Sequence, residues 1–142
     1  QNLMEFKKCS IGGVEYGRGY CEVERAIARR KGQTLPPDPD PPPGLDPGFR
    51  FVDERLLFGQ WRAEREADTI EMFCRSLAIN HGVQVEADPM RPDAVPVFQA
   101  ESPDEGAFVS AARNLGFYFC RRSMKDVVVR IDTPQGREDA TW

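Results

Sequence analysis

The stretch FQAESPDEGAF, residues 98–108, predicts a strand that runs directly into a helix. Ser102 is a typical N-cap residue, and Pro103 fits the first helical position, where no backbone N–H is needed. Asp104 and Glu105 place negative charge in the first helical turn, where the helix dipole favours it. From this local chemistry alone, Glu105 is a capping-box residue whose carboxylate accepts a hydrogen bond from the Ser102 N–H.

The helix that begins after Ser102 is expected to end at Gly116 and to bury one apolar stripe. Residues 117–123 and 127–131 follow it, and their aromatic and β-branched side chains predict an antiparallel strand pair. Residues 95–100 precede it and predict a short strand. The expected stripe consists of Ala107, Phe108, Ala111, Ala112 and Leu115.

A second helix is predicted for Glu66–His81, where apolar residues recur at helical spacing. Asp68 and Glu71 give a capping signal at its start, and Gly82 is a natural stop. His81 is expected to be a partly buried structural histidine, because it lies on the apolar stripe. That stripe consists of Ile70, Phe73, Cys74, Leu77, Ala78 and His81.

The first third of the chain predicts a hairpin and a shorter helix. Gly12–Gly13 stands between the short runs Leu3–Ile11 and Val14–Tyr16, and glycine supplies the positive φ that a type I′ turn needs. Residues 20–31 are expected to be helical, with acidic residues in the first turns, basic residues in the last turn and Gly32 as the stop.

Residues 33–48, QTLPPDPDPPPGLDPG, predict an extended, solvated, proline-rich loop, because proline blocks both helices and strand ladders. Residues 49–58 are ambiguous between a strand and a short helix. Antiparallel pairs and helices without regular βαβ alternation predict an α+β fold, an antiparallel sheet flanked by helices. The length of 142 residues fits one domain, 1–142.

Composition excludes several classes of function. The formal net charge of −4 argues against a nucleic-acid partner, which favours a basic surface. No run approaches the roughly 20 apolar residues of a membrane span. The four cysteines lie far apart and His81 is the single histidine, so no metal site is expected and free, buried thiols in a reducing compartment are favoured.

Motifs for catalysis are absent as well. The glycines at Gly12–Gly13 and Gly17–Gly19 match neither a Walker loop nor a dinucleotide-binding loop. No serine stands in a nucleophile-elbow context. We therefore expect no catalytic residue in this chain.

Residues 98–117, FQAESPDEGAFVSAARNLGF, are similar to the strand–helix segment of the P4 subfamily of P-type ATPases, the phospholipid flippases. That segment has the form Y-x-A-x-S-P-D-E-A-A-L/F-V-x-A-A-R-x-x-G-F. Gly106 replaces the usual alanine, a change that weakens a helix slightly. The matching residues are Ala100, Ser102, Pro103, Asp104, Glu105, Ala107, Phe108, Val109, Ala111, Ala112, Arg113, Gly116 and Phe117.

Residues 1–17, QNLMEFKKCSIGGVEYG, resemble the stretch that follows the phosphorylation motif D-K-T-G-T-L-T in the same family. The resemblance implies a partial nucleotide-binding domain of the P-type ATPase kind that begins just after the phosphorylated aspartate. A chain that starts with Gln1 is expected to be a fragment, a processed product or an excised piece of a longer protein. It is then not expected to hydrolyse ATP, and its sheet is expected to be incomplete.

The resemblance implies that Glu105 contacts the adenine of ATP, with Ser102, Pro103 and Asp104 supporting the helix start. A carboxylate accepts a hydrogen bond from the exocyclic amine of adenine, whereas guanine carries a carbonyl there. The implied cofactors are ATP and Mg²⁺, whose ligands lie outside this chain. The implied partners are a phospholipid substrate and an accessory β-subunit. The full-length protein is expected in a membrane, with this segment in the cytosol.

Two alternatives stay open from the sequence. The chain could be a catalytically inactive regulatory or interaction module in which the proline-rich loop is the working part. It could also belong to a P-type cation pump, although the S-P-D-E form argues against that class. A D-K-T-G-T motif upstream and a K-G-A motif downstream would favour the ATPase.

Overall fold

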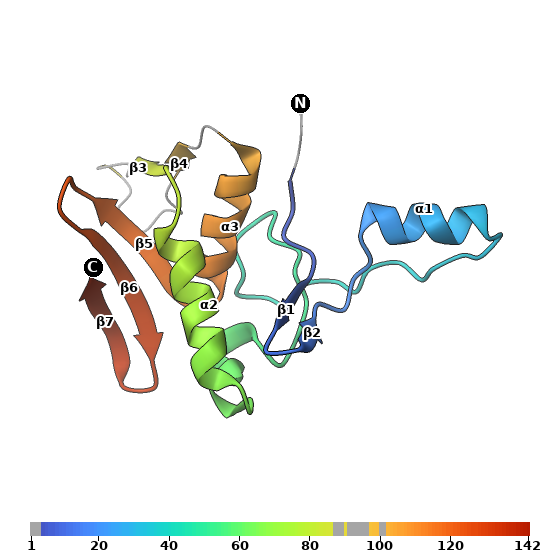
Figure 1. Ribbon diagram of the computed structural model, residues 1–142, viewed down its shortest axis with the longest axis horizontal. Helices are drawn as coiled ribbons and strands as arrows, with labels where there is room; N and C mark the ends of the chain where they lie inside the picture. The colour runs from blue at the N-terminus through green and yellow to red at the C-terminus, as the bar shows by residue number, and fades with distance from the viewer. Residues whose placement is uncertain (1–3, 87–89, 91–96, 100–101) are drawn as a thin grey trace.

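The computed structural model describes residues 4–86, 90, 97–99 and 102–142. Its architecture is α+β, as predicted: within these residues, three small antiparallel sheets accompany three α-helices. The largest sheet contains β5 (Phe117–Arg122), β6 (Val127–Thr133) and β7 (Gly136–Thr141) in that order. The helices α2 (Ala67–Ile79) and α3 (Pro103–Asn114) lie together on one side of it (Figure 1).

The main hydrophobic core lies where α2 and α3 meet the largest sheet. Apolar side chains from all three are removed from water there, which is the dominant favourable contribution to folding. The segment between α1 (Glu22–Arg30) and α2 adds further large residues to this core. The side chains that are at most 3% exposed include Phe51, Leu56, Leu57, Trp61, Ile70, Cys74, Ala111, Ala112, Leu115, Phe117 and Val129.

The predicted hairpin is confirmed. β1 (Cys9–Ile11) and β2 (Val14–Tyr16) pair antiparallel, with Ile11 opposite Val14 across a two-residue turn. Gly12 and Gly13 have φ values of 59° and 81°, as a type I′ turn requires. The strands β3 (Gln84–Glu86) and β4 (Val97–Gln99) form a second pair, which confirms the strand expected within residues 95–100.

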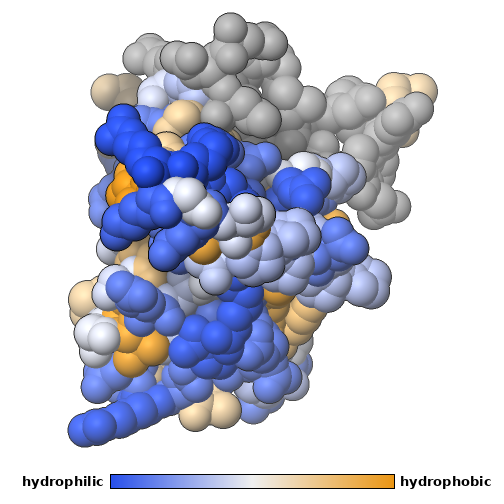
Figure 2. All heavy atoms as spheres, turned by 90° about the vertical axis from the view of Figure 1, so that its right-hand side faces the viewer, coloured by the Kyte–Doolittle hydropathy of each residue, from blue (hydrophilic) through white to orange (hydrophobic). Residues whose placement is uncertain are grey.

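The helix α1 has its acidic residues in the first turn and its basic residues in the last, as predicted, and Gly32 follows with a φ of 71°. It projects away from the two other helices (Figure 1). The surface seen from that side is mainly hydrophilic (Figure 2). Ala28 is its one buried residue, so α1 contributes little to the core.

The amphipathic pattern of α2 is confirmed, although the predicted range, Glu66–His81, was longer than the helix. Ile70, Cys74 and Ala78 are buried, but the helix ends at Ile79 and His81 lies beyond it. The capping signal from Asp68 and Glu71 was wrong: Glu66 occupies the N-cap and its side chain makes no capping hydrogen bond. Apolar packing therefore holds this helix in place without a capped start.

The cap of α3 is confirmed, because the Ser102 Oγ accepts a hydrogen bond from the Asp104 N–H at 3.2 Å. The predicted apolar stripe is partly wrong. Phe108 is 45% exposed, whereas Val109 is fully buried against Val83 and Phe119. α3 packs against both α2 and β5, so its buried face includes Val109 and excludes Phe108.

The proline-rich segment 33–48 contains no helix or strand and none of its residues is buried, as expected for a solvated loop, but it is also held to the rest of the chain. Asp38 accepts hydrogen bonds from Lys7 Nζ at 2.8 Å, Arg25 at 2.7 Å and the Tyr20 N–H at 2.9 Å. These bonds, with that of Lys7 the strongest influence, hold the pKa of Asp38 well below its usual range. Asp46 joins the same segment to α3: its carboxylate accepts a hydrogen bond from Arg113 at 2.8 Å, and its N–H donates to Asn114 Oδ1 at 2.8 Å.

Of residues 49–58, which the sequence left between a strand and a short helix, residues 49–56 form neither, and Leu57 and Phe58 begin a 3₁₀ helix. The chain has no regular secondary structure through Asp53, turns at residues 54–56 and enters Leu57–Ala63, where 3₁₀ turns are interrupted by positive φ values at Phe58 and Gly59. Phe51 is fully buried and touches Phe6, with 5.2 Å between the ring centroids. Tertiary packing rather than the local sequence pattern thus determines the conformation of this segment.

The predicted antiparallel pair of residues 117–123 and 127–131 is confirmed as β5 and β6. The third strand of this sheet, β7, was not predicted.

Phe58 is the one residue other than glycine with a positive φ in the described part of the chain. Its φ of 56° lies in the left-handed region, which asparagine tolerates better than phenylalanine. Phe58→Asn is therefore expected to raise the free energy of unfolding by about 1 kcal/mol. Chemical denaturation with an unchanged slope measures this. Phe58→Ala is the control, since it removes the exposed ring but keeps the unfavourable backbone; an equal gain in both variants would contradict the backbone explanation.

Candidate functional site

Glu105 lies in the first turn of α3, where the sequence places it, and its carboxylate faces the turn that follows α2. The backbone N–H of Gly82 donates a hydrogen bond to Glu105 Oε1 at 3.4 Å. The Glu105 side chain is half-buried. The hydrogen bond expected from the Ser102 N–H stays a prediction, because residue 101, which precedes that N–H, lies outside the described residues.

His81 fixes the backbone beside this carboxylate. Its Nε2 donates to the Ala78 carbonyl at 2.8 Å, and its Nδ1 accepts from the Val83 N–H at 3.1 Å. Its ring meets Phe119 edge-on, with 4.5 Å between the centroids. Burial lowers the pKa of His81, and the positive charge of Arg122 lowers it further. A neutral ring matches both bonds, since Nδ1 must accept; the predicted structural histidine is confirmed.

Arg122, at the end of β5, supports the same turn from another direction. Its guanidinium donates hydrogen bonds to the backbone carbonyls of Ile79 and His81. The Ile79 carbonyl, which also accepts from the His81 N–H at 3.0 Å, ends α2, and the His81 carbonyl lies just beyond it, so these bonds tie β5 to the turn after the helix. No feature of the sequence alone connected Arg122 with residues 79–82, because 41 residues separate it from His81.

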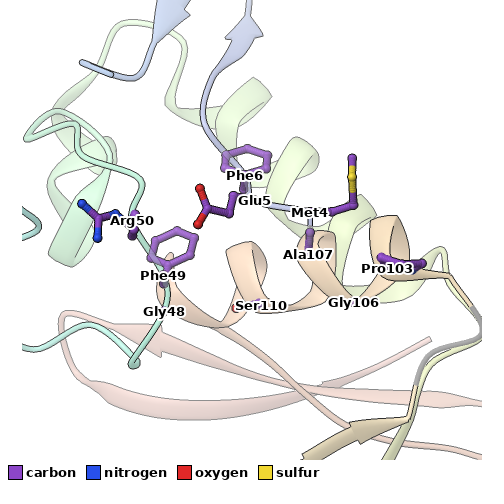
Figure 3. Close-up of a pocket in the computed structure, with 10 residues that line it drawn as sticks. All are labelled: Met4, Glu5, Phe6, Gly48, Phe49, Arg50, Pro103, Gly106, Ala107 and Ser110. Carbon is purple, nitrogen blue, oxygen red and sulfur yellow. The ribbon is translucent and has the colours of Figure 1, made fainter. Parts of the chain in front are cut away.

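A pocket of about 290 Å³ lies on another side of α3. Figure 3 shows the rings of Phe6 and Phe49 facing the space above the small residues of α3, while the guanidinium of Arg50 points away. Glu105 is not among the residues that line it. The lining comprises Met4, Glu5, Phe6, Gly48, Phe49, Arg50, Pro103, Gly106, Ala107 and Ser110.

The predicted residues therefore separate into two groups. Ser102 and Asp104 form the capped start of α3, and Glu105 joins that start to the end of α2. Pro103 turns toward the pocket instead. Glu105 therefore lies at the α2–α3 junction and is not part of the pocket lining.

Groups that could hold a metal ion or act as a nucleophile are not assembled in the described part of the chain. Among these residues no three or more His, Cys, Asp or Glu side chains come together. Cys74 is buried, and burial raises its pKa to about 12, which keeps the thiol protonated and unreactive. In the described residues, the chemistry that this junction offers is hydrogen-bond acceptance by the Glu105 carboxylate.

None of the helices that the structure describes is long and apolar enough to cross a membrane.

Comparison with known proteins gives a consistent result. No family model matches the chain. It is 44% identical over 138 residues to the probable phospholipid-transporting ATPase 12 of Arabidopsis thaliana, and the alignment covers 91% of this chain and 11% of that protein. It is 42% identical to the phospholipid-transporting ATPase 10 of Arabidopsis thaliana, with 96% and 12% covered. It is 40% identical to the phospholipid-transporting ATPase IC of Xenopus tropicalis, with 91% and 9% covered. The chain thus spans about a tenth of the length of these relatives.

Proposed function

Because the chain belongs to the phospholipid-transporting, P4-type ATPases as one segment of them, we propose that it forms part of their nucleotide-binding domain and binds the adenine end of ATP. The observation that carries this proposal is the carboxylate of Glu105, which lies at the start of α3 and accepts a long hydrogen bond from the Gly82 N–H. That bond leaves acceptor capacity on both oxygens.

The chemistry of the carboxylate explains a preference for adenine. The exocyclic amine of adenine donates a hydrogen bond that Glu105 accepts. Guanine presents a carbonyl oxygen at the same place, and two acceptors facing each other leave the carboxylate unpaired. A site built to accept from an amine therefore rejects a base that lacks one. The negative charge of the Glu105 carboxylate lies in the first turn of α3, where the free backbone N–H groups and the helix dipole stabilise it.

In the whole protein, we propose that ATP bound here phosphorylates an aspartate on a neighbouring domain, and that the resulting cycle moves an aminophospholipid toward the cytosolic leaflet. Mg²⁺ would supply neutralisation of the phosphate charge during that transfer. An accessory β-subunit, a membrane location of the full-length protein and a cytosolic location of this segment belong to the same proposal. In that cycle, the role of this chain is to orient the adenine.

Glu105→Gln is expected to remove the preference for ATP over GTP and to weaken ATP binding by about tenfold, because a hydrogen bond to a charged group contributes about 1.5 kcal/mol or more. Parallel titrations with ATP and GTP, followed by backbone amide NMR shifts, measure both effects. The starting chain should show shifts centred on residues 102–108 that are larger with ATP.

The matched control is Glu138→Gln, which removes an exposed carboxylate of β7 on a different element and should leave both titrations unchanged. If neither nucleotide shifts the amides of residues 102–108 in a folded sample, the proposal is wrong for this chain. Equal loss in both variants would show that overall charge, rather than Glu105, determines binding.

An interaction module is the second candidate, and the anchored proline-rich segment favours it. Asp38 and Asp46 hold this segment at two points, while Pro39 and Pro43 between them are exposed. An extended, pre-ordered proline segment fits the aromatic grooves of proline-binding domains. Amide shifts in residues 33–48 on addition of such a domain, without any response to ATP, would favour this candidate.

The third alternative, a P-type cation pump, is disfavoured, because the similar proteins are phospholipid-transporting ATPases.

A further inference from the structure

A single peptide group connects Arg122 with Glu105. Arg122 donates a hydrogen bond to the carbonyl of His81, and the N–H of Gly82 donates to Glu105 Oε1. That carbonyl and that N–H belong to the same peptide unit. Because a trans peptide is planar, its C=O and N–H point in opposite directions. Fixing the carbonyl therefore also fixes the direction in which the N–H meets the carboxylate.

We propose that Arg122 is a positioning residue for adenine recognition: it orients and polarises the peptide group between His81 and Gly82, whose N–H holds the Glu105 carboxylate. This proposal rests on the proposed adenine contact of Glu105. A second bond from Arg122, to the Ile79 carbonyl, prevents the guanidinium from rotating about the first. Hydrogen bonds in such a chain strengthen one another by polarisation.

The strand that carries Arg122 contains a bulge that selects this residue. Phe119 pairs with Val129, but Arg121 pairs with Val128 and Arg122 with Val127, so Cys120 is the extra residue. Directly paired residues lie on the same face, and successive residues alternate between faces. Arg122 therefore shares the face of Phe119. Regular alternation would have placed Arg121 there instead.

The side chains around the turn agree with this role. The guanidinium of Arg122 lies over the Phe119 ring, 5.9 Å from its centroid, which restricts where it can point. Both charges act on the His81 ring: the positive charge of Arg122 lowers its pKa, and the negative charge of Glu105 raises it. Because His81 is the single histidine of the chain, its resonances report on both groups without ambiguity.

The test uses four single variants of the chain: Arg122→Gln, Arg122→Lys, Glu105→Gln and, as the matched control, Arg121→Gln. Without nucleotide, Arg122→Gln should move the Gly82 amide resonance in the direction seen in Glu105→Gln and should raise the pKa of His81. Arg122→Lys should keep the pKa of His81 closer to that of the starting chain, because the charge remains, but should restore the Gly82 resonance in part. Arg121→Gln should change neither.

Nucleotide binding then separates positioning from direct contact. Arg122→Gln should weaken adenosine and ATP binding alike, by about threefold to tenfold, as expected for the loss of one hydrogen bond. If Arg122 acts through Glu105, the same substitution should cause no further loss in a Glu105→Gln background. A loss for ATP but not for adenosine would overturn the proposal, because it would assign Arg122 to the phosphates.

An unshifted Gly82 resonance in a folded Arg122→Gln sample would also overturn it. If Arg122→Gln does not fold, Arg122→Lys carries the same readouts. Absence of adenosine and ATP binding in the starting chain would instead overturn the proposed function and, with it, the role of Arg122 in adenine recognition. The nucleotide-free shifts of Gly82 and His81 would still decide whether Arg122 orients Glu105, so the two failures are distinguishable.

Discussion

Phe117→Ala is expected to lower the free energy of unfolding by about 4 kcal/mol, the largest effect of any substitution considered for this chain. Phe117 begins β5, is fully buried and lies against Trp61, with 5.9 Å between the ring centroids. Removing the ring loses its burial and leaves a cavity between α2, α3 and the sheet, since a close-packed core relaxes only in part. Chemical denaturation followed by tryptophan fluorescence measures the change.

Phe108→Ala is the matched control for that prediction. Its ring is 45% exposed on α3, so the expected change is within about 0.5 kcal/mol. The pair also tests the corrected stripe of α3, because the sequence pattern placed Phe108 on the buried face of that helix. Similar losses in the two variants would contradict the packing of α3 described here.

Asp53→Ala is expected to lower the free energy of unfolding by about 3 kcal/mol, because it removes the centre of a buried polar network. Asp53 is fully buried and accepts hydrogen bonds from the Gly17 N–H at 2.8 Å and from the Arg55 guanidinium at 2.7 Å. Alanine would leave the Gly17 N–H without its partner and Arg55 without its counter-charge. Thermal or chemical unfolding monitored by circular dichroism measures the loss.

The same carboxylate has a defined pH dependence. Burial acts to raise the pKa of Asp53, but the bonds from Arg55 and Gly17 outweigh burial, so its pKa lies below the ordinary value. A group with a lowered pKa in the folded state stabilises above the ordinary pKa and loses that contribution as the pH falls through the folded value. The difference between the starting chain and Asp53→Ala should therefore shrink in strong acid.

Asp139→Ala is the control for Asp53. Asp139 also pairs with an arginine, Arg130, at 2.8 Å, but both side chains are about half exposed. Solvent screens such a pair and replaces its hydrogen bonds, so little change in stability is expected. A loss as large as that of Asp53→Ala would show that charge pairing in general, rather than burial, determines the effect.

Much of the fold follows from local patterns. Gly12–Gly13 specify a turn because they can adopt positive φ, and the recurrence of Ile70, Cys74 and Ala78 specifies a helix with one buried face. Ser102 specifies the start of α3 because its hydroxyl satisfies an N–H within two residues. In each case the interacting groups are close in sequence, so the pattern contains the information.

Of the candidate site, the sequence predicted Glu105 but not the groups around it. The S-P-D-E run placed Glu105 at the start of a helix, and the resemblance assigned it to adenine. The partner of its carboxylate, the Gly82 N–H, lies 23 residues away, and the carbonyls bound by Arg122 lie 41 and 43 residues from it. No local periodicity reports on contacts of that range.

The sequence by itself determined the α+β class, the hairpin at Gly12–Gly13, the capped start of α3 and the family of the chain. Tertiary structure alone decided that Asp53 is the centre of a buried network, that Phe108 faces solvent and that Asp38 anchors the proline-rich segment. It also decided, through one extra residue in β5, that Arg122 rather than Arg121 reaches the turn beside Glu105. Local structure depends on neighbours along the chain, whereas burial, ion pairing and side-chain direction after a bulge depend on which distant segments pack together.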